Sequence, residues 1–449
     1  MEKNVFRAYD IRGIYPSEIN EDFAYTFGLA FGSKMRRENK TSTLVGYDNR
    51  SSSKSLYNSL TKGLLDSGID VISIGFVTSP MCYFARDFFN TKSSIMITAS
   101  HSPKEYNGFK ISFNGIYNAY ENDIQDFYSF ILEKDFTSGS GFLTEENINS
   151  KYIDSLLKDI NINRKLKVVL DAGNGSTSVV IKDVFDKLNI DYIPLFFESD
   201  SNFPNHHPDP SVYSTLDTLR KEVVKNNADI GFAFDGDGDR LGIVDELGNI
   251  IKIDHFIIII LRNIMKDLKN KRILYDVKCS KSLEDEIEKL GGIKYLSKTG
   301  ASILRATLVK ENLSFAGEFS GHIFFNDKYA GYDDGIYASL RMLEILSNSN
   351  KKTSELLEGV EHYYSTPEIK IDVTDENKFE IVEKIKKYCI EKDYKFIDID
   401  GCRILFDDGF ALIRASNTGP NLTLRFESKS EIKLKDMEIE FRNKIEEFI

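Results

Sequence analysis

Three aspartates stand at every second position of one short segment, with only glycine between them. The segment reads Asp235-Gly-Asp-Gly-Asp-Arg240. Glycine permits backbone conformations that a Cβ would forbid, so Asp235, Asp237 and Asp239 can converge on one ion instead of facing alternate sides of a strand. Carboxylate oxygens favour Mg²⁺ or Ca²⁺ over zinc or copper. The spacing therefore predicts a site for a hard divalent cation.

An EF-hand calcium loop is the main alternative, since Glu246 lies where such a loop has its bidentate ligand. The sixth position of that loop requires glycine, however, and here it is Arg240. Residues 230–234 and 241–244 have the composition of short strands, whereas an EF-hand is flanked by helices. A turn that binds no ion is disfavoured because three close carboxylates repel one another.

A serine at the end of a short apolar run is the candidate reacting group. Ser100 lies in the segment of residues 98–110, without the Gly-x-Ser-x-Gly elbow of an acyl hydrolase. A phosphate on Ser100 could complete the coordination of a cation held by the aspartates, while the loop amides and Lys110 neutralise the remaining charge. A lone serine is more often a turn residue, so this interpretation depends on its neighbours.

A second phosphate-binding element is predicted near the C-terminus. Residues 414–420 read Arg-Ala-Ser-Asn-Thr-Gly-Pro and follow an apolar run. Arg414 offers a planar fork that matches phosphate, and Ser416, Asn417 and Thr418 offer neutral donors. An ordinary hairpin turn is the alternative. A phosphate clamp far in sequence from the reacting serine implies a substrate that is held by one phosphate while its other end reacts.

Composition and charge exclude several classes of protein. The chain has 449 residues, with 41% hydrophobic and 29% charged, which is typical of a globular enzyme with roughly three or four domains. Its net charge of −12 repels nucleic acid and anionic membranes, so neither is expected as a partner. The most apolar run, residues 256–261, is too short to span a bilayer and is predicted to be a buried helix. No apolar signal core begins the chain, and a cytoplasmic location is expected.

The cysteines carry no metal or redox motif. Cys82, Cys279, Cys389 and Cys402 are scattered without CxxC or CxxH spacing. We therefore expect reduced, packed thiols.

Short β-rich runs alternate with helical stretches over most of the chain, which predicts α/β layers with parallel strands. Residues 53–66 and 81–89 are two of the predicted helices. The pattern restarts at residues 166–170 and 272–275, whereas the last part has a helix near 376–392, two β-rich segments and a charged helix. We expect three α/β modules with mixed sheets plus a C-terminal α+β domain around a central cleft. The predicted boundaries give domains 1–145, 146–250, 251–365 and 366–449. The segment with Ser100 lies in the first of these domains, the three aspartates lie in the second, and the predicted phosphate-binding segment lies in the fourth.

Taken together, these loops resemble those of the α-D-phosphohexomutases, and most of all the bacterial phosphomannomutase/phosphoglucomutase branch. The resemblance covers nearly the whole chain. It is carried by residues 6–13, 98–110, 203–210, 235–240, 275–278, 317–322, 414–420 and 424–427.

The resemblance implies an enzyme that moves a phosphoryl group reversibly between the 1- and 6-positions of mannose or glucose phosphates. Ser100 would carry the phosphoryl group, with a hexose 1,6-bisphosphate as intermediate and activator. Mg²⁺ would be bound by Asp235, Asp237, Asp239 and a phosphoserine oxygen of Ser100. The other catalytic candidates are His101, Lys110, Arg240 and His322, and the substrate-binding candidates are Tyr9, Arg12, Lys278, Glu318, Ser320, Arg414, Ser416, Asn417 and Thr418. The implied partners are small hexose phosphates, and the chain is expected to be a monomer or weak homodimer.

Two positions depart from the pattern of the family. The serine loop has Ser102 where asparagine is usual, and Ala301 stands where the most similar branch has a histidine that contacts substrate. The balance between glucose and mannose therefore stays open. A phosphoglucosamine mutase is an alternative, although the residue between Glu318 and Ser320 is the apolar Phe319 here, whereas that branch has a glutamine at this position. A non-catalytic protein that binds sugar phosphate or a cation is an alternative of another class.

Overall fold

The structure is a computed structural model that describes residues 1–188, 190–416 and 419–449. The described chain divides into two compact units. The first unit combines Met1–Ile253 with Ser320–Leu356, and the second combines Asp254–Phe319 with Leu357–Ile449.

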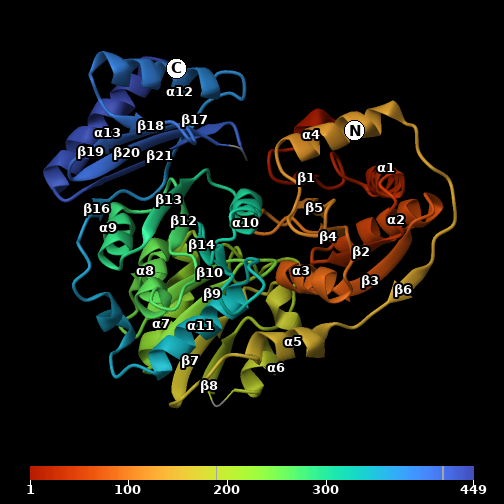
Figure 1. Ribbon diagram of the computed structural model, residues 1–449, viewed down its shortest axis with the longest axis horizontal. Helices are drawn as coiled ribbons and strands as arrows, with labels where there is room; N and C mark the ends of the chain where they lie inside the picture. Colours follow the sequence, from red (N-terminus) through yellow and green to blue (C-terminus); the bar gives the residue numbers. More distant parts are fainter. Residues whose placement is uncertain (189, 417–418) are drawn as a thin grey trace. The chain divides into compact units, whose positions relative to one another are not determined.

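The first sheet of the first unit carries the serine loop (Figure 1). Its strand order is β1-β5-β4-β2-β3-β6, for Ile11–Ile14 (β1), Ser42–Tyr47 (β2), Asp70–Phe76 (β3), Ser94–Ile97 (β4), Tyr106–Ser112 (β5) and Leu143–Glu145 (β6). Strands β4, β2, β3 and β6 are parallel, whereas β5 is antiparallel to β4 and β1. The helices here are Glu21–Arg37 (α1), Ser53–Asp66 (α2), Ser79–Phe88 (α3) and Asn122–Glu133 (α4).

The second sheet of this unit carries the aspartate loop. Its order is β11-β10-β9-β7-β8, for Leu166–Asp171 (β7), Ile190–Leu195 (β8), Ile230–Phe234 (β9), Leu241–Asp245 (β10) and Ile250–Ile251 (β11). The loop joins the antiparallel strands β9 and β10 instead of two helices, so the EF-hand alternative is wrong. The other elements of this part are Asn149–Leu157 (α5), Ile181–Asp186 (α6), Asp217–Lys225 (α7), Ile323–Phe325 (β15) and Gly335–Ser347 (α11).

The second unit contains one set of parallel strands and one antiparallel sheet. Strand β12 (Arg272–Asp276) lies between β13 (Ile293–Ser297) and β14 (Phe315–Gly317) and is parallel to both. Its helices are Ile253–Ile264 (α8), Lys281–Lys289 (α9) and Ala301–Lys310 (α10). The antiparallel sheet has the order β16-β21-β20-β19-β18, and β17 also pairs with β21. Its elements are Tyr364–Ser365 (β16), Ile369–Asp372 (β17), Lys378–Glu391 (α12), Phe396–Ile397 (β18), Cys402–Phe406 (β19), Gly409–Ala415 (β20), Asn421–Ser428 (β21) and Glu431–Glu446 (α13).

These sheets confirm the predicted fold class of α/β modules with mixed sheets and a C-terminal α+β part. Strands β4, β7, β9 and β10 are buried along almost their whole length, which explains their continuous apolar sequences. The apolar run near residue 258 is the buried helix α8, as predicted. In the C-terminal part, α12 and α13 pack on the sheet around a core that includes Ile413, Phe426 and Phe441.

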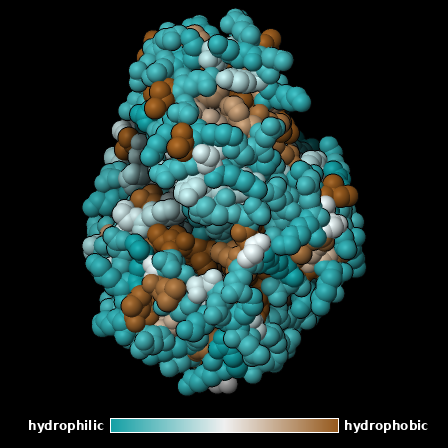
Figure 2. Space-filling view, turned by 90° about the vertical axis from the view of Figure 1, so that its left-hand side faces the viewer, coloured by the Kyte–Doolittle hydropathy of each residue, from teal (hydrophilic) through white to brown (hydrophobic). Residues whose placement is uncertain are grey.

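The surface and the cysteines agree with the composition. The face drawn in Figure 2 is mostly hydrophilic, with hydrophobic residues confined to limited patches. Among the described residues, no helix combines the length and the apolarity that crossing a bilayer requires. All four cysteines are buried free thiols, as predicted.

Helices α1 and α2 lie side by side (Figure 1) and approach each other through glycine. A Cβ on Gly63 of α2 would lie 2.1 Å from the carbonyl oxygen of Tyr25 in α1. A Cβ on Gly28 of α1 would lie 2.3 Å from the carbonyl oxygen of Leu60 in α2. Backbone atoms cannot move aside as a flexible side chain can, so these two positions fix the distance between the helices.

Replacing Gly63 with alanine should destabilise the protein, although alanine is the better helix former. The clash with the Tyr25 carbonyl group should lower the free energy of unfolding by about 1–3 kcal/mol. The exposed Asn58 of the same helix is the control, because Asn58→Ala should leave stability unchanged or raise it. Urea unfolding of both variants tests this, and a Gly63→Ala chain as stable as the wild type would contradict close packing of the helices.

Candidate functional site

The aspartate loop turns back on itself directly after strand β9. Asp235, Asp237 and Asp239 are at most 1% exposed, and their carboxylate oxygens lie within 4.8 Å of one another. Gly238 has a φ of +80°, which side chains with a Cβ rarely adopt. A Cβ on Gly236 would lie 2.5 Å from the carbonyl oxygen of Ser100. The alternating glycines therefore allow the three carboxylates to converge, as the spacing predicts.

Lys110 on β5 neutralises part of the negative charge of the three aspartates. Its Nζ atom donates hydrogen bonds to Asp237 at 2.6 Å and to Asp239 at 2.5 Å. Burial, together with the charges of Asp239 and Asp237, raises the pKa of Asp235 well above its usual value. Burial also opposes the ionisation of Asp237, but the Lys110 ammonium group outweighs it and lowers the pKa of Asp237. The single positive charge of Lys110 therefore does not balance the charge of three buried carboxylates.

The donor set fits a hard divalent cation. One carboxylate oxygen of Asp237 and one of Asp239, Oδ1 in each case, are buried and have no hydrogen-bond partner among the described residues. Buried carboxylate oxygens without donors are costly, and oxygen ligands of this kind suit Mg²⁺ or Ca²⁺. Asp239 also shares a cluster with His322 and Asp333, whose ligand atoms likewise lie within 4.8 Å of one another.

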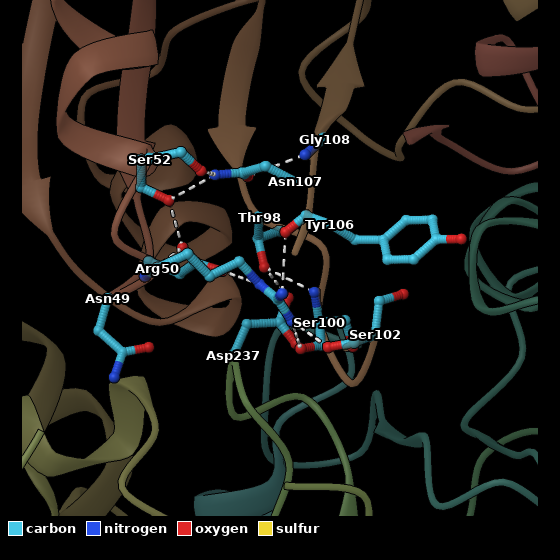
Figure 3. Close-up of polar contacts among 12 residues, drawn as sticks. Asn49, Arg50, Ser52, Thr98, Ser100, Ser102, Tyr106, Asn107, Gly108 and Asp237 are labelled. Atoms are coloured by element: carbon cyan, nitrogen blue, oxygen red, sulfur yellow. Dashed lines mark hydrogen bonds and ion pairs between the residues drawn. The ribbon is translucent and has the colours of Figure 1, made fainter. Parts of the chain in front are cut away.

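Ser100 points at the aspartate loop (Figure 3). Its hydroxyl group donates to Asp235 Oδ2 at 2.7 Å and lies 3.2 Å from His101 Nδ1. Burial, with the nearby charges of Arg240 and Arg12, lowers the pKa of His101 well below its usual value, which favours the neutral form of its ring. The structure thus brings the predicted serine, histidine and carboxylates together within one unit.

The N-terminal candidates contribute to the serine loop unequally. Arg12 Nη1 donates to Ser102 Oγ at 2.7 Å, and its other terminal nitrogen pairs with Asp10. The serine that replaces the usual asparagine therefore still accepts a hydrogen bond. Tyr9 is partly buried in the same unit.

Arg240 and His322 form the other side of the aspartate loop. Arg240 Nε donates to His322 Nε2 at 2.9 Å, and the backbone N–H of Arg240 donates to Asp235 Oδ1 at 3.1 Å. His322 Nδ1 lies 2.7 Å from Asp333 Oδ2. Burial lowers the pKa of His322, but the carboxylates of Asp239 and Asp333 outweigh it and raise that pKa. His322 is therefore held between a guanidinium group and a carboxylate.

The second unit contains most of the predicted substrate contacts. Glu318 is 3% exposed and accepts a hydrogen bond from the Gly300 backbone N–H at 2.9 Å. Lys278 Nζ lies 3.1 Å from Glu368 Oε1. Burial lowers the pKa of Lys278, but the carboxylates of Glu368, Asp276 and Glu318 outweigh it and raise that pKa. Ser320 is partly buried and belongs to the first unit.

The predicted phosphate loop follows strand β20. Arg414 Nε donates to Asp400 Oδ2 at 3.0 Å, and Ser416 is 6% exposed. Lys378 Nζ donates to the Ser416 carbonyl oxygen at 2.7 Å. Asn417 and Thr418 lie outside the described residues.

Sequence reasoning missed several side chains that orient these groups. The hydroxyl group of Ser79 donates to Asp237 Oδ2 at 2.5 Å, and that of Thr98 donates to the same oxygen at 3.3 Å. Asp333 faces His322, and Asp400 faces Arg414. The Asp-Asp-Gly turn before α11 is a signal that could have drawn attention to Asp333. Ser79 and Thr98 have no such signal, because only the tertiary structure brings α3 and β4 to the aspartate loop.

Comparison with known proteins identifies the family. The four phosphoglucomutase/phosphomannomutase domain models match this chain in order: alpha/beta/alpha domain I at residues 3–137, domain II at 150–248, domain III at 252–363 and the C-terminal domain at 368–444. The chain belongs to the phosphoglucomutase/phosphomannomutase family. This confirms the resemblance that the motifs indicated.

Individual members of the family are similar over nearly their full length. The phosphomannomutase/phosphoglucomutase of Pseudomonas syringae is 42% identical over 96% of this chain and 92% of its own. The phosphoglucomutase of Neisseria gonorrhoeae is 38% identical over 99% of this chain and 97% of its own. The crystal structure of a phosphoglucomutase/phosphomannomutase family protein from Burkholderia thailandensis has a TM-score of 0.92 and 36% identity, and covers 99% of this chain and 97% of that one.

Replacing Asp237 with asparagine removes one charge from the aspartate loop with almost no change of shape. The affinity for a divalent cation should fall on the order of 10–100-fold, because carboxylate charge sets the strength of such sites. Titration with Mn²⁺ followed by electron paramagnetic resonance measures this without an activity assay. Asp217→Asn, at the exposed start of α7, is the control and should bind Mn²⁺ like the wild type. Equal affinity in the Asp237→Asn chain would contradict the site.

Replacing Asp333 with asparagine should loosen the orientation of His322. We expect turnover to fall on the order of 10–100-fold, with little change in KM, because His322 is a candidate for proton transfer and such a group depends on its geometry. Asp327→Asn is the control, since Asp327 forms an ion pair with Arg341 in the same unit, whereas Asp333 lies in the cluster with Asp239 and His322. If both variants lost turnover equally, Asp333 would have no particular link to His322.

Proposed function

We propose that this member of the family moves a phosphoryl group reversibly between the 1- and 6-positions of a hexose phosphate, with Ser100 as the carrier. The observation that carries the proposal is the position of Ser100 Oγ, 2.7 Å from Asp235 in a buried cluster of three carboxylates. Phosphoryl transfer needs positioned groups that offset charge, and this cluster with its cations supplies them. The names of the similar proteins support the same reaction.

Mg²⁺ is the cation proposed for the aspartate loop, held by Asp235, Asp237 and Asp239 with an oxygen of phosphorylated Ser100. When bound, it would offset the negative charge of the phosphoryl group during transfer. The hydroxyl group of Ser79 and the Lys110 ammonium group keep Asp237 fixed and ionised. The domain boundaries predicted from the sequence stay a prediction, as does a monomer or weak homodimer.

The chain's own residues account for the movement of atoms. The bond between phosphorus and Ser100 Oγ breaks while a sugar hydroxyl oxygen bonds to phosphorus, giving a hexose 1,6-bisphosphate. The proton of that hydroxyl group passes to a base, and Ser100 Oγ takes up a proton. His322 is proposed to exchange these protons, while Lys110 and Arg240 keep their charges and stabilise the phosphoryl group. In the return step the other phosphate is transferred to Ser100.

Substrate recognition is proposed for the second unit, with Glu318 and Lys278 at the sugar and Arg414 and Ser416 at the distal phosphate. Tyr9, Arg12 and Ser320, which belong to the first unit, and Asn417 and Thr418 complete the proposed set. Asp400 neutralises Arg414 in this structure, so a bound phosphate would have to share or replace that carboxylate. Removal of the phosphate should therefore be easy, which suits a clamp that must release and rebind either end of a bisphosphate.

Mannose or glucose phosphate is favoured over glucosamine phosphate by the environment of Phe319. The guanidinium group of Arg425 lies 4.1 Å from the centre of the Phe319 ring. An apolar ring stacked in this way offers no polar group to an amino sugar. A phosphoglucosamine mutase and a non-catalytic binding protein are the alternatives that the experiment below distinguishes.

Incubation with glucose 1,6-bisphosphate labelled in its phosphates tests the carrier directly. The wild type should retain label on Ser100, and it should interconvert the 1- and 6-phosphates of glucose or mannose faster than those of glucosamine. Ser100→Ala should retain no label and lose turnover by at least about 10³-fold. Ser129→Ala, an exposed serine of α4, is the control and should behave like the wild type. A binding protein would show neither labelling nor turnover, and faster turnover of glucosamine phosphate would favour the other branch.

A further inference from the structure

The loop that carries Ser100 is folded around the side chain of one arginine (Figure 3). Arg50 Nη2 donates to the carbonyl oxygens of Ser100 and Ser102, each at 2.7 Å. Arg50 Nη1 donates to the carbonyl oxygens of Pro103 at 2.7 Å and Tyr106 at 2.9 Å. Four carbonyl groups from seven consecutive residues thus accept from a single guanidinium group.

This arginine is itself buried and paired with a carboxylate. Arg50 is 3% exposed, and its Nε atom lies 3.2 Å from Oδ2 of Asp48, which is also buried. The other carboxylate oxygen of Asp48 accepts from the hydroxyl group of Ser53 at 2.5 Å and from the Arg50 backbone N–H at 3.0 Å. A buried ion pair contributes little net stability compared with apolar residues of similar volume. Its value here lies in the geometry that it imposes on the loop.

The hydrogen bonds of Arg50 help to fix the backbone conformation of Ser100. Ser100 has a φ of +49°, a left-handed conformation that costs a residue with a Cβ on the order of 1 kcal/mol or more. Its carbonyl oxygen is fixed between Arg50 Nη2 and the space left by Gly236. Its backbone N–H donates to Thr98 Oγ1 at 2.8 Å. With both backbone groups fixed in this way, the hydroxyl group faces Asp235.

We propose that Arg50 is the positioning residue of the serine loop, whose guanidinium fork holds Ser100 in the orientation that phosphoryl transfer requires. The proposal rests on the proposed function only in taking Ser100 as the carrier. Lysine cannot replace Arg50, because one ammonium nitrogen has three donors and cannot span four carbonyl groups that lie on both arms of a planar fork.

Arg86 provides a matched control. It is an equally buried arginine on α3 of the same unit, 2% exposed, and its Nη2 atom donates to the Ile116 carbonyl oxygen at 3.0 Å, outside the serine loop. Arg50→Lys and Arg86→Lys therefore make the same chemical change in equally buried places. They differ in whether the serine loop loses its support.

The first measurement needs no activity. Hydrogen exchange of the backbone amides of residues 98–106 should become faster in Arg50→Lys, while the aspartate loop and the second unit exchange as in the wild type. Arg86→Lys should leave residues 98–106 unchanged. Equal exchange of these residues in Arg50→Lys and wild type would overturn the proposal, whatever reaction the protein catalyses.

The second measurement links the loop to the reaction. Arg50→Lys should lower both turnover and the rate of labelling of Ser100 by about 100-fold, as expected for a displaced reacting atom, with KM for the hexose phosphate and Mn²⁺ affinity unchanged. Arg86→Lys should keep wild-type turnover. An unchanged rate in Arg50→Lys, or an equal loss in both variants, would overturn the proposal. A wild type that is never labelled would instead refute the proposed function, and the exchange result would still stand.

If Arg50→Lys does not fold, Ser53→Ala takes its place. This variant removes the hydrogen bond from Ser53 to Asp48 and the one that Ser53 accepts from Asn107. It leaves Arg50 present, and Asn107 keeps its hydrogen bond to Ser52, so the fold should survive. Turnover should fall by about tenfold without a change in KM, together with faster exchange of residues 98–106. Wild-type turnover and exchange in Ser53→Ala would overturn the proposal.

Discussion

The mutual repulsion of three buried carboxylates is the constraint on which the site depends. Asp235, Asp237 and Asp239 are buried almost completely, where charges are weakly screened. Lys110 and the guanidinium group of Arg240 offset part of this charge, and the buried carboxylate oxygens without donors provide the place for a divalent cation. The loop is therefore complete only with a cation, and any negative phosphoryl group that enters depends on the same balance.

Rigid supports hold each charged group at its working distance. The aspartate loop follows a fully buried strand, and the serine loop follows another, so both start from fixed ends. Arg50 then fixes the carbonyl groups of the serine loop, and Asp333 fixes His322. These supports are buried polar groups, and the hydrogen bonds and ion pairs that they form make alternative conformations costly. The second unit has a similar arrangement, in which Asp400 accepts from both Arg414 and the Thr299 backbone N–H.

Much of the fold could be predicted because local patterns and tertiary structure agree. Helix α2 has the predicted bounds Ser53–Asp66, and α12 covers most of the predicted helix near 376–392. Helix α3 begins at Ser79, two residues before the start predicted from the apolar periodicity. Its beginning is set by the cap at Thr78 and by the proline in its first turn, and a periodic pattern does not reveal either of them. The strand-like flanks of the aspartate loop were also correct, because fully buried strands have continuous apolar sequences.

The sequence by itself determined the chemistry of this protein: the converging aspartates, the serine after a strand, the arginine of the C-terminal loop and the family. Side-chain type and spacing along the chain carry that information. Only the tertiary structure decided which distant groups support them. Arg50 contacts Ser100 of the serine loop, which lies 50 positions further along the chain. Ser79 and Asp237 contact each other although 158 positions separate them. Such contacts depend on how strands and helices pack, and no local pattern records that packing.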